Sequence, residues 1–380
     1  MSTLKVSKVE PVTSGGDCIV AATNIVGNKN LFHNGAMEVA QRGTSSTTSG
    51  YGTVDRWKHQ HGGTDEAPTY AQVSLTSSDT GPWAKGFRKA LQVTNGNQTG
   101  GADAADYIQI WQGTEAQDLA SSGWDYTSAS SYITLSFWVK SSVAQSFFGA
   151  FRTVDGTSQN YHFQTGSLSA NTWTKIIKKI PGASGIQFDS NSDVGLYMYL
   201  FPFLGTDLTS SISEDTWMAA TSTNYTADNT STWYTTNDAT FAVTGFQLEV
   251  GDVATAFEHR TYADYLAACQ RYYYKIASDN AEDSMFGVGW ASSGSYFQTM
   301  TTFPVTMRTK PSALETSGTS SHYRLNWSGG NNSGTNGPVF STATTHSATV
   351  QFQGGTFTDG QGGYLRSNDT NAYLAWSADF

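Results

Sequence analysis

Charged side chains are scarce in this chain. They make up 14% of its 380 residues, and 31 acidic residues against 21 basic ones leave a formal net charge of −10. Lys and Arg form no run anywhere in the sequence. Because binding to nucleic-acid phosphates depends on neutralisation by Lys and Arg, this balance argues against a nucleic-acid partner.

Long apolar runs are also absent. No stretch approaches the length of about 18 residues that a membrane-spanning helix needs. The opening residues, MSTLKVSKVEPV, lack the continuous apolar core of a secretory signal. We therefore expect no membrane insertion, and synthesis in a cytoplasm without export by the usual route.

Cysteine is nearly absent, with only Cys18 and Cys269. A chain of this length can bury a core without disulfides, so their scarcity does not limit folding. Cys269 lies on the apolar stripe of a predicted helix and is expected to be buried.

The chain is rich in aromatic residues, which make up 13% of it, and it holds 38 glycines. Ser, Thr and Asn supply most of the polar remainder. This composition is typical of short β-strands joined by Gly, Asn and Ser turns. No repeat of about 20–50 residues is present, which argues against a solenoid or a propeller. We predict an all-β protein.

Turn signals divide the chain into four predicted segments. Residues 1–27 are expected to form N-terminal strands for attachment or trimerisation. Residues 28–260 contain about nine strands with long returns, which favours a jelly-roll sandwich. Residues 261–276 are predicted as a short connecting helix, and residues 277–380 as a smaller distal β domain.

The boundary between the sandwich and the helix is the clearest local signal. Phe246, Leu248 and Val250 are expected to point inward from a strand, and Gln247 and Glu249 outward. The helix is predicted from apolar positions three and four residues apart: Tyr262, Leu266, Cys269, Tyr273 and Ile276. On its outer face we expect Tyr272 and Tyr274 to contact another subunit.

A second local signal opens the sandwich. Asn34 and Gly35 form a dipeptide that can turn the chain at positive φ. Downstream, Asp55 and Arg56 are predicted to form a buried ion pair beneath Trp57. We interpret both as structural rather than functional.

Several motifs occur together and in order: NLFHNGAMEVAQRG, DRW, FQLEVGDVATAFEHR, ACQRYY, GVGWASS and FPVTMRTKP. Together they resemble bacteriophage tail-fibre and related virion-surface proteins. The resemblance implies a central jelly roll similar to carbohydrate-binding modules, a homotrimer, and a place on the virion surface.

Because such modules often carry structural calcium, the resemblance also implies a calcium site. Glu38 and Glu249 are the carboxylates predicted to hold it.

Aromatic residues beside polar turns carry the binding hypothesis. Sugar rings stack on Trp and Tyr, while amide and carboxylate groups bind their hydroxyls. The predicted ligand-binding residues all lie in the distal domain: Trp290, Tyr296, Tyr323, Trp327, Tyr364 and Trp376.

Sequence motifs of hydrolases are missing, with no Gly-x-Ser-x-Gly, His-Glu-x-x-His or P-loop. Glycan cleavage needs two carboxyl groups, and Asp103 with Asp106, or Glu214 with Asp215, are candidate pairs. A glycan-cleaving site is therefore kept as an alternative.

We predict a non-enzymatic tail-fibre or spike component that recognises host-surface polysaccharide. It would contact other virion proteins through its N-terminus. A head fibre or capsid-decorating protein, a depolymerising tailspike and a stand-alone carbohydrate-binding module are the alternatives.

Overall fold

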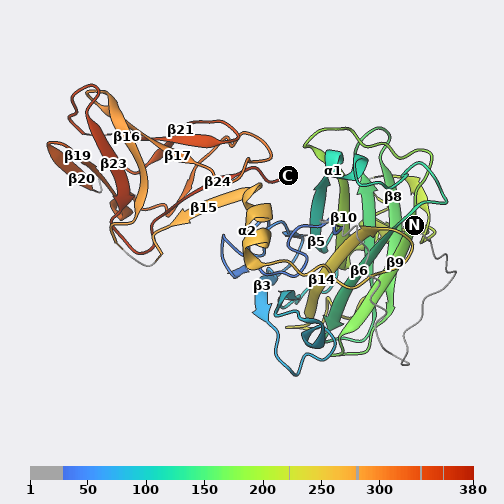
Figure 1. The fold of residues 1–380 in the computed structure, drawn as a ribbon. Coiled ribbons are helices and arrows are strands. Elements are labelled where there is room, and N and C mark those ends of the chain that lie inside the picture. The colour runs from blue at the N-terminus through green and yellow to red at the C-terminus, as the bar shows by residue number, and fades with distance from the viewer. Residues whose placement is uncertain (1–28, 222, 280–281, 334–335, 354) are drawn as a thin grey trace, which may run out of the picture.

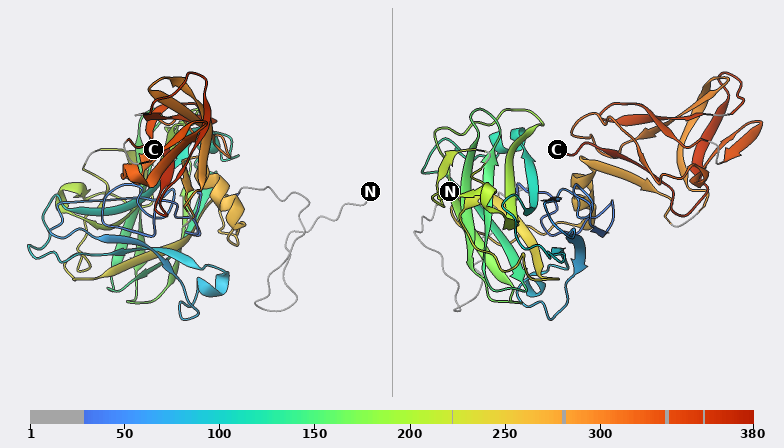
Figure 2. Two further views of the ribbon diagram at one scale, coloured as in Figure 1. Left: turned by 90° about the vertical axis from the view of Figure 1, so that its left-hand side faces the viewer. Right: turned by 180° about the vertical axis from the view of Figure 1, so that it is seen from behind.

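The computed structural model describes residues 29–221, 223–279, 282–333, 336–353 and 355–380. Figure 1 shows two β domains with the helix α2 between them, and Figure 2 shows the same arrangement from two further sides. The predicted all-β architecture, a jelly-roll sandwich followed by a helix and a smaller β domain, is confirmed. The predicted N-terminal strands at residues 1–27 lie outside the described residues.

The larger domain is a sandwich of two six-stranded antiparallel sheets. Sheet A contains, in spatial order, β1 (Ser45–Ser46), β3 (Thr69–Ser74), β4 (Lys89–Thr94), β14 (Thr240–Val250), β6 (Tyr132–Ser141) and β9 (Thr174–Pro181). Sheet B contains β12 (Trp217–Ala219), β8 (Gln159–Ser167), β7 (Ser146–Thr153), β10 (Val194–Leu204), β5 (Tyr107–Glu115) and β2 (Lys58–Gly62). A two-stranded parallel pair, β11 (Thr209–Ser210) and β13 (Thr226–Ala227), lies in the loops after β10.

The core of this domain lies between sheets A and B. In β6, side chains alternate, and Ile133, Leu135, Phe137 and Val139 are all fully buried. Phe137 stacks on Phe246 of β14, with ring centroids 4.7 Å apart. This alternation matches the pleat of a strand with one face in the core.

The end of β14 differs from the predicted alternation. Phe246 and Leu248 are buried as expected, but Gln247 and Glu249 are buried too, and Val250 is exposed. The segment that follows β14 folds back over this strand, and the backbone N–H of Glu258 donates to Gln247 Oε1 at 2.7 Å. The outward face is therefore covered by the chain itself.

The turn at Asn34 and Gly35 is confirmed. Asn34 has a φ of 53°, and a Cβ on Gly35 would lie 2.1 Å from the Phe246 carbonyl oxygen. The predicted ion pair between Asp55 and Arg56 is wrong. Asp55 instead accepts hydrogen bonds from the backbone and side chain of Gln41. Arg56 donates to the Gly113 carbonyl oxygen at 2.6 Å and lies 3.7 Å from Asp379.

The predicted helix at residues 261–276 is too long. The helix α2 spans Tyr262–Gln270, and residues 273–277 form the strand β15 (Tyr273–Ala277). A capping box between Thr261 and Asp264 fixes its start. Tyr265 and Cys269 are its buried side chains, whereas Tyr262 is exposed, so the predicted apolar stripe is only partly correct.

The distal domain has two antiparallel sheets, and its core lies between them. Sheet C contains β15, β24 (Tyr373–Ser377) and β18 (Glu315–Thr316). Sheet D contains β20 (Gly330–Ser333), β19 (Tyr323–Trp327), β23 (Gly362–Ser367), β16 (Met285–Ser293), β17 (Tyr296–Thr302), β22 (Ser347–Gln353) and β21 (Val339–Ala343).

The remaining helical elements are short. They are α1 (Ala116–Ala120) and the 3-10 turns η1 (Trp83–Lys85), η2 (Thr206–Leu208) and η3 (Ser320–His322). Among the described residues, no helix has the length and apolar character that crossing a membrane requires.

Polar contacts join the two domains beside α2. Arg271 forms a two-pronged ion pair with Glu115 of β5, with N···O distances of 2.6 and 2.7 Å. From the distal domain, Arg308 donates to the Ser192 carbonyl oxygen at 3.0 Å. Gln41 of the sandwich donates to the Tyr273 carbonyl oxygen at 2.8 Å. We refer to these contacts as the domain junction.

Candidate functional site

An aromatic groove lies on the outer face of sheet B. It has a volume of about 340 Å³ and is lined by Gln60, Tyr107, Gln109, Trp111, Tyr199, Leu204, Leu208 and Tyr225. We call this set the aromatic groove. Three strands and the loops after β10 contribute to it.

The alternation of β5 explains one wall of the groove. Ile108 and Ile110 are fully buried in the core between the sheets. Tyr107, Gln109 and Trp111 therefore lie on the opposite, outer face. In the next strand, β10, Met198 and Leu200 point to the core in the same way, which turns Tyr199 outward.

Strand pairing places these rings side by side. Trp111 lies directly opposite Tyr199 of β10 on one side and Lys58 of β2 on the other. The rings of Trp111 and Tyr199 have centroids 5.9 Å apart, and the Lys58 ammonium lies 4.7 Å from the Trp111 ring. The indole is 7% exposed, so the ligand-accessible rings are the half-buried tyrosines around it.

The loops after β10 supply the other wall. The backbone N–H of Tyr225 donates to the Leu208 carbonyl oxygen at 3.1 Å, which holds both side chains at the edge of the sheet. Phe201 packs beneath Tyr225 with ring centroids 6.4 Å apart. A Tyr–Leu wall therefore faces the Tyr–Trp wall across the groove.

A pair of amides lies between the rings. Gln109 Nε2 donates to Gln60 Oε1 at 3.1 Å, and Gln60 Nε2 donates to the Tyr107 hydroxyl at 3.2 Å. Each amide and hydroxyl has further hydrogen-bonding capacity in the groove. This combination of apolar faces and fixed neutral polar groups suits a ligand that carries many hydroxyls.

Acid–base chemistry has little support in the groove. Among its described lining residues there is no carboxylate and no histidine. Burial raises the pKa of the Tyr199 hydroxyl, so it stays neutral and serves as a hydrogen-bonding group. The groove therefore offers stacking faces and neutral hydrogen-bonding groups.

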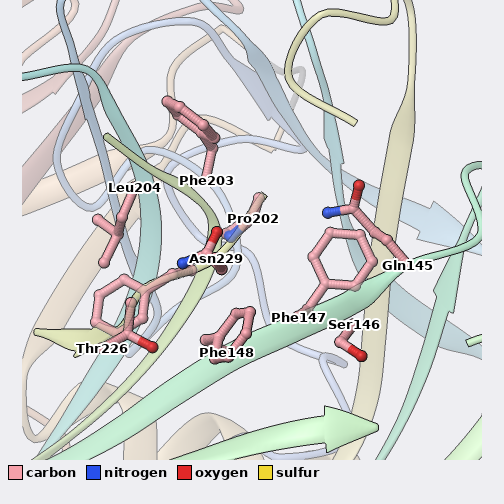
Figure 3. Close-up of a pocket in the computed structure, with 10 residues that line it drawn as sticks. Gln145, Ser146, Phe147, Phe148, Pro202, Phe203, Leu204, Thr226 and Asn229 are labelled. Atoms are coloured by element: carbon pink, nitrogen blue, oxygen red, sulfur yellow. The ribbon is translucent and has the colours of Figure 1, made fainter. Parts of the chain in front are cut away.

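A second, much smaller cavity lies close by, between β7, β10 and β13. Figure 3 shows its lining, which includes Phe147, Phe203 and Asn229. Its volume is about 10 Å³, which is room for about one water molecule. A cavity of this size is too small to hold a sugar ring.

Three of the predicted ligand-binding residues lie together on the outer face of sheet D. Trp290 is 48% exposed and Tyr296 is 42% exposed. Tyr364, on the neighbouring strand β23, accepts a hydrogen bond from Asn326 at 3.0 Å. These three side chains are placed where a ligand can reach them, and their ligand-binding role stays a prediction.

The other three predicted ligand-binding residues are less accessible to a ligand. Tyr323 and Trp376 are buried in the core of the distal domain, with exposures of 1% and 0%. Neither offers a ring face to a ligand, so their assignment as ligand-binding residues is wrong. Trp327 is half-buried, and its ring packs edge-on against Phe357 at a centroid distance of 5.0 Å.

The predicted subunit contacts at Tyr272 and Tyr274 are also wrong. Tyr272 is 1% exposed, and its hydroxyl donates to Glu115 Oε1 at 2.5 Å. Tyr274 packs against Phe303 and Trp376. Because Tyr273 begins a strand, these rings face the domain junction and the distal core rather than another subunit.

The carboxylates predicted to bind calcium lie in different surroundings. Glu249 is 3% exposed, and its oxygens accept hydrogen bonds from Gln247 and Thr255 at 2.7–2.8 Å. Partial burial raises the pKa of Glu38. No group of three or more His, Cys, Asp or Glu suited to a metal occurs in the described part of the chain. A calcium site at these residues stays a prediction.

The carboxylate pairs considered for glycan cleavage hold loops in place. Asp106 accepts hydrogen bonds from the Tyr234 hydroxyl at 2.9 Å and from the Asp103 backbone at 2.8 Å. Glu214 accepts one from Gln164 at 2.8 Å. In both pairs, these hydrogen bonds give the carboxylates a role in holding the loops.

Sequence reasoning missed the aromatic groove. The signal was present in the two strands YIQIW and LYMYLF, where aromatic or amide residues alternate with aliphatic ones. Such strands have one aliphatic core face and one aromatic outer face. The wall formed by Leu208 and Tyr225 carries no such signal, because it is brought to the sheet by a long loop.

No family model matches the sequence, and no curated protein matches it. Similarities were found among solved structures. The enzymatically active domain of tailspike protein 4 from bacteriophage CBA120 has 10% sequence identity and a TM-score of 0.32, over 59% of this chain and 22% of the tailspike chain. The chain thus spans less than a quarter of that relative.

Two carbohydrate-binding modules are similar over nearly their whole length. A xylan-binding domain from family 22 has 11% identity and a TM-score of 0.28, over 57% of this chain and 99% of its own. A family 4 module has 11% identity and a TM-score of 0.30, over 57% of this chain and 98% of its own. Function does not transfer at this level of similarity, so the functional conclusion rests on the groove itself.

Proposed function

We propose that this chain is a virion-surface fibre or spike component that binds a host-surface glycan in the aromatic groove without cleaving its backbone. The observation that carries the proposal is the amide pair Gln60 and Gln109 framed by Tyr107, Tyr199 and Tyr225. Aromatic rings stack on the C–H faces of sugars, and amides bind sugar hydroxyls.

The uncharged lining narrows the ligand class. The groove holds no carboxylate or histidine among its described lining residues, and the chain as a whole has a net charge of −10. A polyanionic glycan would be repelled by this field. A neutral, hydroxyl-rich polysaccharide is the ligand class that the groove fits.

The virion role and the homotrimer rest on the sequence motifs. In a trimer, three copies of a weak site would raise avidity by about 10²–10⁴-fold where the geometry allows simultaneous contact.

An exposed apolar face on the distal domain supports the assembly of several copies of the chain. On sheet D, Met285, Val288, Trp290 and Met300 are each 48–60% exposed, and such patches are typical of protein contacts. Attachment to other virion proteins is assigned to residues 1–27.

Glycan binding to the groove can be tested with one variant and one control. The double variant Tyr199→Ala and Tyr225→Ala removes a ring from each wall of the groove. Binding to a neutral polysaccharide, found by glycan array and measured by calorimetry, should weaken at least about tenfold. Tyr262→Ala removes an exposed ring on α2, 59% exposed, and should leave binding unchanged.

Equal binding by the double variant and the wild type would rule out the groove. The depolymerase alternative is tested in the same samples. The polysaccharide chain length should stay constant during incubation with the wild type, and a fall would favour a cleaving tailspike.

A further inference from the structure

A cluster of reactive side chains lies in the distal domain, far from the aromatic groove in sequence. An open pocket of about 510 Å³ is formed where β15, the loop after β18, η3 and the start of β24 meet. Its lining includes Ser317, His322, Lys275 and Tyr373. It combines a hydroxyl, an imidazole and a cation in one solvent-accessible depression.

Ser317 and His322 are hydrogen-bonded to each other. The Ser317 Oγ and His322 Nδ1 atoms are 2.9 Å apart. The other ring nitrogen, Nε2, lies 3.8 Å from Asp369 Oδ1. In the tautomer that carries its proton on Nε2, Nδ1 accepts the Ser317 hydroxyl proton. A hydroxyl hydrogen-bonded to an imidazole is the arrangement that a nucleophile and its general base require.

Asp369 provides the negative charge beside the imidazole. Its Oδ1 lies 3.8 Å from His322 Nε2. Hydrogen bonds from the backbone and side chain of Asn371, at 2.7 and 2.9 Å, lower the pKa of Asp369 and keep it ionised. An ionised carboxylate at this position stabilises the imidazolium that forms when the base takes up a proton.

Short contacts hold the three groups in position. The backbone N–H of Asn368 donates to the His322 carbonyl oxygen at 2.7 Å, which ties the Asp369 turn to η3. The Ser317 backbone N–H donates to the Tyr323 hydroxyl at 2.9 Å. Tyr323 in turn donates to the Tyr373 carbonyl oxygen at 2.6 Å and is buried. The nucleophile and base are therefore anchored to the distal core.

Lys275 supplies positive charge to the same pocket. Its ammonium donates to the Gln41 carbonyl oxygen at 3.1 Å and lies 4.4 Å from the Tyr373 ring. A cation in the same pocket favours the negatively charged oxygen that forms during acyl transfer.

We propose that Ser317, His322 and Asp369 form a triad that hydrolyses small acyl esters. Ser317 Oγ attacks the ester carbonyl carbon, and its proton passes to His322 Nδ1. The bond between the carbonyl carbon and the alcohol oxygen then breaks, and His322 returns the proton to the leaving alcohol. Water attacks the acyl-serine in the same way, which releases the carboxylic acid and restores Ser317.

The pocket is open and shallow, so it fits an acyl group of a few carbons carried on a larger molecule. The carrier we infer is a sugar hydroxyl, and this part rests on the glycan binding proposed above. Removal of such an acyl group leaves the glycan backbone intact.

The triad can be tested without a glycan. The full chain is incubated with a fluorophosphonate probe, and the labelled residue is identified by peptide mass spectrometry. We expect an adduct on Ser317 that is lost in His322→Gln, with thermal unfolding showing that the variant is folded. Hydrolysis of p-nitrophenyl acetate should fall about 10²-fold or more in Ser317→Ala, while the neighbouring Ser321→Ala matches the wild type.

A wild-type chain that carries no adduct on Ser317, or equal ester hydrolysis by Ser317→Ala and Ser321→Ala, would overturn the triad. Because the probe and the ester contain no sugar, this result is independent of glycan binding. If the chain binds glycan but Ser317 is not labelled, the triad is ruled out and the glycan-binding proposal is unaffected.

Discussion

Arg271 holds Glu115 in a two-pronged ion pair, and Glu115 is fully buried although it lies at the end of a sandwich strand. Burial by itself would raise the pKa of Glu115. Hydrogen bonds from Arg271 and Tyr272 outweigh this effect and lower the pKa. The pair joins β5 of the sandwich to the residues that lead into the distal domain, so it connects the two cores.

We predict that Glu115→Gln destabilises the protein by about 3 kcal/mol, because it leaves the Arg271 guanidinium and the Tyr272 hydroxyl facing an amide group. Chemical denaturation followed by fluorescence measures this change. Glu282→Gln alters an exposed carboxylate of the distal domain and should shift stability by less than about 0.5 kcal/mol. Equal stability of the two variants would show that the ion pair contributes nothing.

The pH dependence of stability should reveal Asp55. Burial raises the pKa of Asp55 from 3.8 to about 6. Between these two values the folded chain retains a proton that the unfolded chain has released, so stability falls as pH rises through this window.

Asp55→Asn removes the Asp55 contribution to this slope. The free energy of unfolding of the wild type should fall by about 2 kcal/mol relative to the variant between pH 4 and pH 7. Urea titrations at several pH values measure the difference. Parallel curves for the two proteins would contradict the raised pKa.

Glycan binding in the aromatic groove should be nearly independent of pH and salt. The described lining residues include no group that ordinarily titrates between about pH 5 and pH 9. Neutral contacts are also insensitive to ionic screening. Calorimetry at pH 5.5 and 8.5, in low and high salt, should give dissociation constants within about twofold. A tenfold change would show that a charged group takes part.

The exposed face of sheet D should control assembly. Val288 and Met300 lie directly opposite each other across β16 and β17, and both are more than half exposed. Val288→Lys with Met300→Lys should convert a trimer to a monomer in native mass spectrometry, because buried charges oppose association. The double change Val253→Lys and Tyr262→Lys, at two exposed sites elsewhere, should leave the trimer intact. A persistent trimer, or a monomeric wild type, would contradict this assignment.

Strand positions could be predicted where one face of a strand is apolar. The strand β6 is such a case, because its inward positions are all Ile, Leu, Phe or Val. The strand β8 carries no such pattern, since its sequence QNYHFQTGS has buried Asn160 and His162 beside its aromatic residues. Burial of polar groups depends on partners that lie far away in sequence, such as the Asn224 carbonyl that contacts His162.

The length of the connecting helix shows a similar limit. The spacing of apolar residues continued past Gln270 and fitted a longer helix. Pairing of Tyr273–Ala277 with β24 instead draws these residues into a sheet. Local helix propensity is weak enough to be overridden by such tertiary pairing. The same change turned Tyr272 and Tyr274 inward and removed them as subunit contacts.

The sequence by itself determined the all-β class, the jelly-roll sandwich, the position of the helix and the turn at Asn34, because alternation and turn chemistry are local properties. Tertiary structure decided which aromatic rings are accessible. Trp376 and Trp290 look alike in sequence, yet one is fully buried and the other half exposed. The groove, the domain junction and the triad each join residues from distant segments, so only the packing of sheets and loops brings their side chains together.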